Sequence, residues 1–523
     1  MMGRLAAILL CTTAPVALTA QEVNLRSPDE FISVDGEIVG FNGVMLRVQT
    51  TVGAVSVPAS EVICYGPACL DVLANNDFGL TADALAGVEA SSVAAASSAP
   101  ASTTPALGGE LTIAFASPTT NAFYTSFAGT VSGAQVDGAT VTLGDGATLN
   151  ATTDLAAADV AVQTVTLLGE REAAFDGASG WSANAGALTH QMVGLNAFAV
   201  QVSPSTGLTS ISVDDLTRVF SGEVTNWQQI GGANLAVLAL RLPDGTPAFR
   251  DLQAVLLDPE GAQIAPGVLA MGDEAGITAS VNQFPGSIAV VSAAAANADL
   301  TIPVAGSCGL AVAPTPFNII SGDYPLLRPV MATYGGAAPQ SVTDFFDAAA
   351  RDQAQALGQV LGLQNFSAVQ QDSSIKNARL SGLLNATLDD AQRTAAAQMF
   401  QTLFGADRLS TTLIGGAVSG PEAAWNRAMM IDLAETLSAP ANAGREVIFV
   451  GVGSSDAGSA AAVTASANAA AEMQAAFQAF AGGVVVQSGL RLSSYGFGDV
   501  AATTCIDSQV ANGEATHVEV WIR

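Results

Sequence analysis

The turn at residues 241–246 combines residue types that can bind an anion. A predicted strand, residues 235–241, ends at Arg241, and the sequence Leu-Pro-Asp-Gly-Thr then leads into a segment with apolar residues at helical spacing. The free backbone N–H groups and the dipole at the start of a helix favour negative charge. The turn is therefore a candidate anion site. The alternative is that Asp244 or Thr246 only caps the helix.

Motifs for catalysis and metal binding are missing from the sequence. It contains no Gly-x-Ser-x-Gly nucleophile elbow and no Gly-rich phosphate loop that ends in Lys-Ser or Lys-Thr. The two histidines, His190 and His517, stand apart from any cysteine that could share a zinc ion with them. We expect His517 on the surface, and Trp227 and Trp425 in the core. The sequence thus predicts no enzyme, no cofactor and no metal site.

The amino terminus has the pattern of a secretory signal peptide over residues 1–20. Arg4 is followed by the apolar residues 5–10 and by small residues before Gln21. This apolar run is shorter than the roughly 20 residues of a membrane-spanning helix. We therefore expect an exported chain that is found in the periplasm.

The net charge limits the kinds of binding partner, and the cysteines indicate where disulfides can form. The formal net charge is −29, with 17 Lys and Arg against 46 Asp and Glu, which excludes a nucleic-acid partner because phosphate backbones need clustered bases. Cys64 and Cys69 flank a Tyr-Gly-Pro-Ala turn, and we predict a disulfide there. Cys308 and Cys505 could pair with each other or stay as buried thiols, and the sequence leaves both open.

Patterning divides the chain after the signal peptide into five parts. Residues 21–85 form a predicted small β domain, with a hairpin at Asn42-Gly43 and a further strand at 51–57. Residues 86–107 are rich in Ala, Ser, Thr and Pro, which predicts a disordered linker. Strand and helix patterns alternate over residues 108–363, which predicts an α/β domain with mainly parallel strands. Residues 364–404 are a predicted helical connection, and residues 405–523 form the last domain.

Several elements are predicted individually. In the α/β domain the clearest strands are 111–115, 158–162, 198–202, 235–241 and 287–291, and one helix runs from 343 to 363, with Ser341 and Asp344 at capping-box spacing. The last domain has the predicted order β-α-β-α-β-β. Its elements are a strand from 407, helices at 421–437 and 463–480, and strands at 446–452, 483–492 and 518–522.

Two segments of the α/β domain carry a resemblance to a known family. Phe220-Ser221-Gly222 is followed by Thr225-Asn226-Trp227, and a strand lies at Gly286–Val291. This run resembles the phosphate-binding solute receptors of ABC transporters over residues 108–340. The resemblance implies a two-lobed periplasmic-binding-protein-like fold that binds a small anion, without catalysis. Residues 308–310 and 323–326 are further similar to a subgroup in which this domain is fused to an OmpA-like domain.

The resemblance implies specific ligand residues, of which this chain keeps some. Arg241, Gly245 and Thr246 match the family's anion-binding turn, but Asp244 stands where the family has serine. A carboxylate about 4 Å from an anion costs on the order of 4 kcal/mol at an effective dielectric constant near 20. In the first lobe, the resemblance points to Ser117, Thr119 and Asp159. The ligand site is therefore expected to be partly degenerate.

The last domain resembles the OmpA-like peptidoglycan-binding domain. The similar segments are residues 451–458, 495–499 and 518–522. Family members hold the cell-wall peptide with an aspartate and an arginine, which implies a role for Asp456. The helix that should supply the arginine has none, and Arg491 is a candidate substitute. Peptidoglycan binding is therefore expected to be weak or lost.

The expected function is that of a periplasmic solute-binding protein, of phosphate-receptor type, with an OmpA-like domain directed to the outer membrane or cell wall. The alternative is a structural envelope scaffold that keeps both folds but has lost its small ligand and its peptidoglycan. Its partners would then be other envelope proteins.

Overall fold

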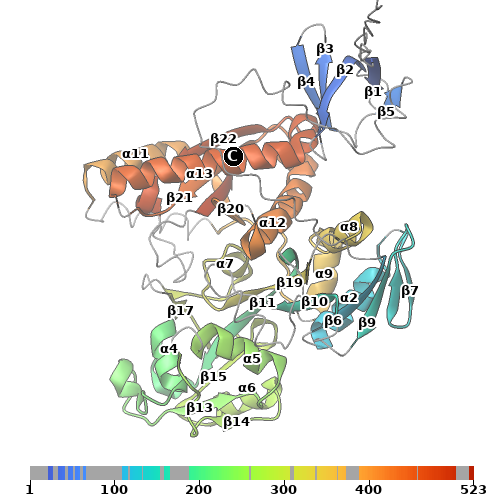
Figure 1. Cartoon of the computed structure of the whole chain (residues 1–523). Helices are drawn as coiled ribbons and strands as arrows, with labels where there is room; N and C mark the ends of the chain where they lie inside the picture. Colours follow the sequence, from blue (N-terminus) through green and yellow to red (C-terminus); the bar gives the residue numbers. More distant parts are fainter. Residues whose placement is uncertain are drawn as a thin grey trace, which may run out of the picture. The chain divides into compact units, whose positions relative to one another are not determined.

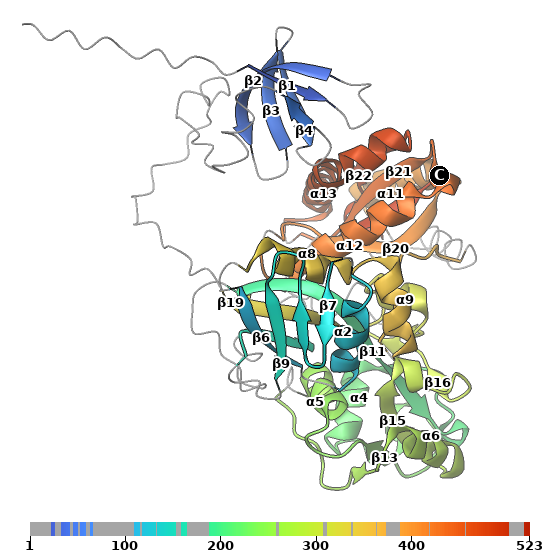
Figure 2. The ribbon, with the colours of Figure 1, turned by 90° about the vertical axis from the view of Figure 1, so that its right-hand side faces the viewer.

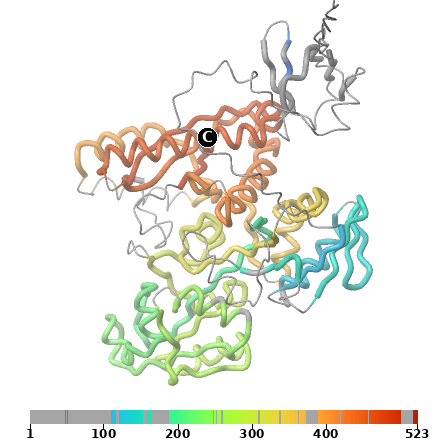
Figure 3. The backbone as a smooth tube through the Cα atoms, in the orientation of Figure 1, coloured from blue at the N-terminus to red at the C-terminus, as the bar shows by residue number. Residues whose placement is uncertain are grey.

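The computed structural model describes most of the chain, and Figure 3 traces its backbone from the N-terminus to the C-terminus. The described residues are 22–26, 33–41, 45–50, 53–58, 63–65, 109–115, 118–131, 133–152, 158–164, 188–257, 261–306, 311–335, 338–361, 363–372, 388–417, 419–455, 457–501 and 517–523. The predicted signal peptide at 1–20 and linker at 86–107 lie outside them. Two compact units are present, residues 1–101 and residues 102–523.

The first unit contains an antiparallel sheet in the order β4-β3-β2-β1-β5. Its strands are β1 (Glu22–Arg26), β2 (Ser33–Phe41), β3 (Met45–Thr50), β4 (Gly53–Pro58) and β5 (Ile63–Tyr65). The two strands predicted to flank Asn42-Gly43 pair as β2 and β3, and the strand predicted at 51–57 is β4. The turn itself lies outside the described residues.

The second unit begins with a large mixed sheet in the order β14-β13-β15-β11-β19-β10-β6-β9-β8-β7, with β16 also paired to β11. The strands before residue 203 are β6 (Glu110–Phe115), β7 (Gln135–Asp137), β8 (Thr140–Thr142), β9 (Thr148–Thr152), β10 (Val160–Thr164) and β11 (Leu188–Val202). The later ones are β13 (Leu238–Arg241), β14 (Leu269–Ala270), β15 (Ser287–Ser292), β16 (Thr301–Ile302) and β19 (Leu327–Gly335). A small sheet joins β12 (Ile211–Ser212), β17 (Val304–Ala305) and β18 (Ala311–Val312).

Two strands, β11 and β19, cross from one half of the large sheet to the other. They pair antiparallel from Leu188 opposite Gly335 to Ala197 opposite Leu327. Beyond this point β11 no longer pairs with β19, and it pairs antiparallel with β15 instead. The prediction of mainly parallel strands is therefore wrong for the centre of the sheet, because these long crossing strands are antiparallel to each other and to their neighbours.

The crossing strands separate two lobes, which we define by their residues. Lobe 1 comprises residues 109–164 and 338–361, and lobe 2 comprises residues 203–326 (Figure 2). The helices of lobe 1 are α2 (Pro118–Ala128), α8 (Gln340–Ala348) and α9 (Asp352–Val360). Those of lobe 2 are α4 (Val213–Phe220), α5 (Pro247–Leu252), α6 (Glu274–Gln283) and α7 (Pro316–Ile320). We call Asn196–Phe198 of β11 together with 327–330 of β19 the hinge segment.

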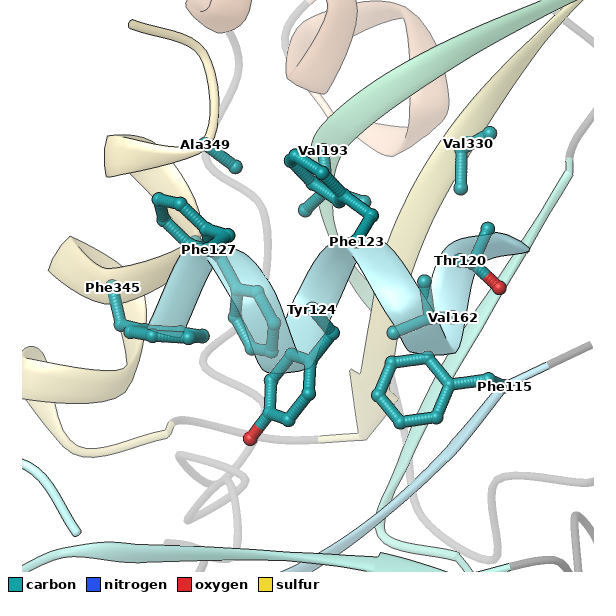
Figure 4. A pocket seen from close by; sticks show the side chains of 11 residues that line it. Phe115, Thr120, Phe123, Tyr124, Phe127, Val162, Val193, Val330, Phe345 and Ala349 are labelled. Atoms are coloured by element: carbon teal, nitrogen blue, oxygen red, sulfur yellow. The ribbon is translucent and has the colours of Figure 1, made fainter. Parts of the chain in front are cut away.

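Lobe 1 is held together by an aromatic core. The Phe123 and Phe127 rings of α2 stack at 5.6 Å between centroids, and Phe345 of α8 lies 5.1 Å from Phe127. Figure 4 shows these rings around a cavity of about 10 Å³, which is large enough for about one water molecule. This cavity is a packing defect in an apolar core and is too small for a solute.

Trp227 anchors the core of lobe 2. Its side chain is fully buried, and its indole N–H donates to the carbonyl of Gly286 at 2.9 Å. The matching anchor in the last domain is Trp425, 2% exposed, whose indole N–H donates to Thr412 at 2.8 Å. Both tryptophans are core residues, as predicted.

The helix predicted over 343–363 is two helices, because the chain breaks at residues 349–351 between α8 and α9. The capping box predicted from Ser341 is also wrong, since α8 already begins at Gln340 after Pro339. Residues 364–404 are helical only in part. Residues 363–372, here called the connecting segment, form no helix and only two isolated β-bridges. Helix α11 (Asp390–Leu403) packs in a core with strands of the last domain.

The last domain, here called the carboxy-terminal module (residues 388–523), has a sheet in the order β20-β23-β21-β22. After α11 its elements are β20 (Asp407–Ile414), α12 (Gly420–Ser438), β21 (Glu446–Val452), α13 (Ser459–Gln487), β22 (Arg491–Gly496) and β23 (His517–Ile522). This is the predicted β-α-β-α-β-β order. The strand predicted at 483–492 is wrong, because α13 continues through its Val-Val-Val run to Gln487 and β22 starts only at Arg491.

No helix in the described part of the chain is both long and apolar enough to cross a bilayer.

Candidate functional site

The parallel strands of both lobes point at the hinge segment. In lobe 1, β10 runs antiparallel to β19 from Val160 opposite Tyr334 to Thr164 opposite Val330, and β6 is parallel to β10. In lobe 2, Ser292 at the end of β15 lies opposite Phe198, and β13 is parallel to β15. The carboxyl ends of β6, β10, β13 and β15 are thus all directed toward the hinge segment. In open α/β sheets, ligands bind beyond the carboxyl ends of the strands.

Arg241 is the last residue of β13 and therefore lies at this hinge-facing edge of lobe 2. Its guanidinium group is bound within its own turn, with Nη1 donating to Asp244 Oδ1 at 2.8 Å and Nη2 to Asp244 Oδ2 at 3.2 Å. The Arg241 side chain is 12% exposed and packs over the Phe249 ring at 4.6 Å, whereas Asp244 is 78% exposed. Asp244 thus neutralises the cation that the turn would offer to an anion.

Thr246 is the N-cap residue of α5. Its hydroxyl oxygen accepts a hydrogen bond from the Phe249 N–H at 3.4 Å, and its own N–H and hydroxyl both donate to the Pro243 carbonyl. Gly245 has φ +79°, a left-handed conformation that favours glycine and shapes the turn. The groups of Thr246 are therefore engaged in the capping role considered above as the alternative to anion binding.

The two described residues predicted for lobe 1, Thr119 and Asp159, are not brought together. Thr119 lies in the first turn of α2, beyond the carboxyl end of β6, and Ser117 lies outside the described residues. Asp159 precedes β10, at the edge away from the hinge segment. Its Oδ2 accepts hydrogen bonds from the Thr112 N–H at 2.8 Å and from the Thr112 hydroxyl at 2.7 Å. Asp159 thus joins β10 to β6, and the structure separates it from the start of α2 by the length of these strands.

Arg328 is a cation near the hinge that sequence reasoning missed. It lies on β19 opposite Asn196, is 7% exposed, and its Nη2 donates to the Thr164 carbonyl at 3.4 Å, at the carboxyl end of β10. Its signal in the sequence is a charged residue within an apolar run, 326–332, which was not recognised as a strand. A buried charge is expensive and usually has a specific role.

The candidate residues of the other two domains are only partly described. Arg491 is exposed at the start of the edge strand β22, whereas Asp456 lies outside the described residues. Cys64 lies in β5 opposite Leu25, and its predicted disulfide partner Cys69 is outside the described residues.

His517 is buried, 8% exposed, which corrects the prediction of a surface residue. It opens β23, which is flanked by β20 and β21, so the strand that follows carries it into the sheet. Its Nε2 lies 4.0 Å from Glu519 Oε1. Over the described residues, no group of three or more His, Cys, Asp and Glu side chains is arranged to hold a metal ion.

Comparison with known proteins gives results that concern the α/β domain. Residues 94–353 match the model of the PBP superfamily domain. The chain is 24% identical over 164 residues to the phosphate-binding protein PstS of Bacillus subtilis, an alignment that covers 31% of this chain and 53% of that protein. The chain thus spans about half the length of this curated relative.

Two solved structures are similar at lower identity. An ABC-type phosphate transport receptor from Vibrio cholerae is 16% identical with a TM-score of 0.37, over 48% of this chain and 98% of that one. PstS from Borrelia burgdorferi is 16% identical with a TM-score of 0.38, over 49% and 98%.

The curated relative is named a phosphate-binding protein, and the prediction of a non-enzymatic binding protein agrees with that name. The mixed sheet, its covering helices and this family match together support a PBP-like domain at residues 94–353.

Proposed function

We propose that the chain is an exported solute-binding protein of the periplasm, whose PBP-like domain binds a small anion such as phosphate between its two lobes. The observation that carries this proposal is the strand register, which directs the parallel strands of both lobes toward one hinge segment. Arg241 stands at that edge. The names of the relatives favour phosphate over other anions.

The Arg241–Asp244 ion pair makes the proposed site partly degenerate. An incoming anion must either displace the Asp244 carboxylate from the guanidinium group or bind beside it against like-charge repulsion. A protonated anion suffers less, because its O–H can donate to the carboxylate. We therefore expect weak binding that favours the monohydrogen or dihydrogen form.

Arg328 is the second cation of the proposed site. It lies on the hinge strand β19 at the end of β10, so its charge is near the edges of both lobes. With Ser117 and Thr119 before and within the first turn of α2, it would complete the lobe 1 side of the anion site. Asp159 is the weakest of the proposed ligand residues, because it lies at the opposite edge.

For the other parts of the chain we propose the roles that the sequence suggests. The carboxy-terminal module is an OmpA-like domain that directs the protein to the outer membrane or cell wall, with Asp456 and Arg491 as its peptidoglycan contacts. Cys64 and Cys69 form a disulfide in the small β domain. Pull-down on purified peptidoglycan tests the wall contact, which Asp456→Ala should remove.

A scaffold that has lost its solute is the second candidate. Two observations favour this scaffold: the Arg241 guanidinium group forms an ion pair with Asp244, and Thr246 is the N-cap residue of α5. In this case the two folds would serve envelope proteins as an interaction surface.

Isothermal titration of the exported chain with inorganic phosphate, sulfate and other small anions separates the two candidates. Asp244→Ser frees the Arg241 guanidinium and should tighten phosphate binding by about tenfold or more, equivalent to about 1.4 kcal/mol. Arg328→Gln in the same background should weaken binding again, and the exposed Asp299→Ser is the control that should change nothing. If the Asp244→Ser protein gives no heat with any anion, the binding proposal is wrong and the scaffold remains.

A further inference from the structure

The carboxy-terminal module packs against the crossing strands of the PBP-like domain. Helix α12 lies along β11 (Figure 1), and one hydrophobic core contains Leu195 of β11, Phe366 of the connecting segment and Met429 of α12. The module therefore covers the part of the sheet that joins the two lobes.

A buried ion pair links the module to the start of β19. Arg408 of β20 is fully buried, and it donates to both carboxylate oxygens of Asp323, from Nη1 at 2.7 Å and from Nη2 at 3.2 Å. Asp323 lies in the loop that leads from α7 into β19. On the module's side, Glu519 of β23 lies 3.5 Å from Arg408 Nε and is fixed by the Trp521 indole N–H at 2.9 Å.

A second polar chain links the module to the far end of the crossing strands. Arg427 of α12 donates from Nε to Asp347 Oδ1 of α8 at 2.9 Å. The same Asp347 oxygen accepts from Gln191 Nε2 of β11 at 3.0 Å, and Gln191 Oε1 accepts from the Tyr334 hydroxyl of β19 at 2.8 Å. Helix α12 is thus joined through one carboxylate to lobe 1 and to both crossing strands.

The connecting segment, residues 363–372, makes a third connection. Gln364 forms a bridge with Leu195 of β11, and Gln370 forms one with Leu409 of β20. Between them, the Ala368 N–H donates to Asp432 Oδ2 of α12 at 2.9 Å. This segment is hydrogen-bonded to the PBP-like domain at one end and to the module at the other.

These contacts anchor the module on both sides of the hinge segment. Asp323 precedes β19, and Asp347 follows it on α8. Two-lobed binding proteins close around a ligand by rotation at a few hinge residues. Such a rotation would change the spacing between Asp323 and Asp347, and breaking a buried ion pair on one side is strongly unfavourable.

We propose that the carboxy-terminal module is a brace on the hinge: it joins the two lobes and itself into one cooperative unit and couples any movement of the lobes to the module. The coupling to ligand rests on the proposed solute-binding function. The brace does not, and the experiment below is done without any anion, so its failure is distinct from a failure of solute binding.

Hydrogen–deuterium exchange of the full exported chain, read by mass spectrometry, tests the brace. Arg427→Gln removes the α12–α8 link, and we expect exchange in peptides from residues 188–197 and 327–335 to become about tenfold faster. Arg218→Gln is the matched control, because Arg218 also forms an ion pair on a helix and is 45% exposed, against 48% for Arg427, but it lies on α4 of lobe 2. Exchange in the crossing strands should not change in this control.

A second readout does not depend on any variant that could fail to fold. With fluorotryptophan incorporated, fluorine NMR follows Trp227 of lobe 2 and Trp521 of β23 separately through urea unfolding. One cooperative unit requires that both signals change at the same urea concentration. Separate transitions for Trp227 and Trp521, or equal hinge exchange in the Arg427→Gln and Arg218→Gln proteins, would overturn the proposal.

Discussion

Single buried charges decide much of the behaviour of this molecule, and Asp432 of α12 is the clearest case. It is fully buried between α12 and the connecting segment, where one carboxylate oxygen accepts from the Ala368 N–H. Desolvation, together with the charges of Asp352 and Glu435, raises the pKa of Asp432 to about 8. Across the described residues no hydrogen bond to its other oxygen, Oδ1, is formed, which fits a protonated carboxyl.

The raised pKa of Asp432 predicts a protein that loses stability as the pH rises. Between about pH 4 and pH 8 the Asp432 carboxyl is protonated in the folded protein and ionised in the unfolded chain. The free energy of unfolding therefore falls as the pH rises through this window, by up to about 1.4 kcal/mol per pH unit. The stabilising contribution of the protonated carboxyl is fully present below about pH 4. Asp432→Asn keeps the acceptor for Ala368 and should remove this slope, so the variant is more stable than the native chain at pH 8 but not at pH 4. Thermal unfolding between pH 4 and pH 9 measures this, with Asp299→Asn as an exposed control. If Asp432→Asn is less stable than the native chain by the same amount at every pH, the ionisation of Asp432 does not cause the pH dependence.

At the proposed anion site, the sequence was sufficient to identify the turn but not its internal hydrogen bonds. Arg241 and the helix start at Thr246 follow from local patterns. The ion pair between Arg241 and Asp244 depends on side-chain geometry, which cannot be predicted from the residue types alone. Arg328 was missed for a different reason, since its role depends on the crossing of β19 past β10, a contact between residues far apart in the chain.

At the scale of elements, helix α13 approaches the sheet of the module unusually closely. A Cβ added at Gly451 of β21 would lie 1.8 Å from the Ser466 carbonyl oxygen, and one at Gly496 of β22 would lie 2.0 Å from the Ala467 nitrogen. These obstructing atoms are backbone, which cannot move aside without displacing the helix. Glycine at both positions is therefore what allows α13 to pack here.

Gly451→Ala should accordingly destabilise the module strongly, by about 3 kcal/mol or more, because the helix must shift from β21. Urea unfolding of the full chain measures the loss. Gly272→Ala is the matched control, since no atom lies within 4 Å of its added Cβ, and it should stay within about 0.5 kcal/mol of the native chain. If the two alanine variants are equally stable, the close approach of α13 is not required.

Elements with strong patterns were predicted well, and those decided by packing were not. The strand at 446–452 and helix α12 agree with the predictions because their apolar periodicity is long and regular. The run Val484–Val486 has strand propensity, yet it completes α13, where Val485 is buried against the sheet. The antiparallel pairing of β11 and β19 likewise has no local signal in the sequence. The two strands are far apart in the chain, and their relative direction depends on the path of the chain between them.

At the scale of the whole molecule, the chain consists of two compact units that divide at Ala101 and Ser102. The first unit has one sheet, and the second contains the sheets of both the PBP-like domain and the carboxy-terminal module. The division falls within the segment 86–107, whose composition predicts a linker. The proposed functions of solute binding and hinge bracing therefore require only the second unit.

Limited proteolysis tests this division directly. The predicted linker contains no Lys or Arg but many alanines, so trypsin has no site there whereas elastase does. We expect elastase to cut first between residues 86 and 107 and to leave a fragment that begins near residue 108 and ends at Arg523. Because that fragment retains the internal packing of the second unit, its thermal unfolding and any phosphate binding should match those of the uncut chain. First cuts between the PBP-like domain and the module, for example near residue 380, would instead show that the brace is the weaker junction, and the second unit would then have to be divided in two.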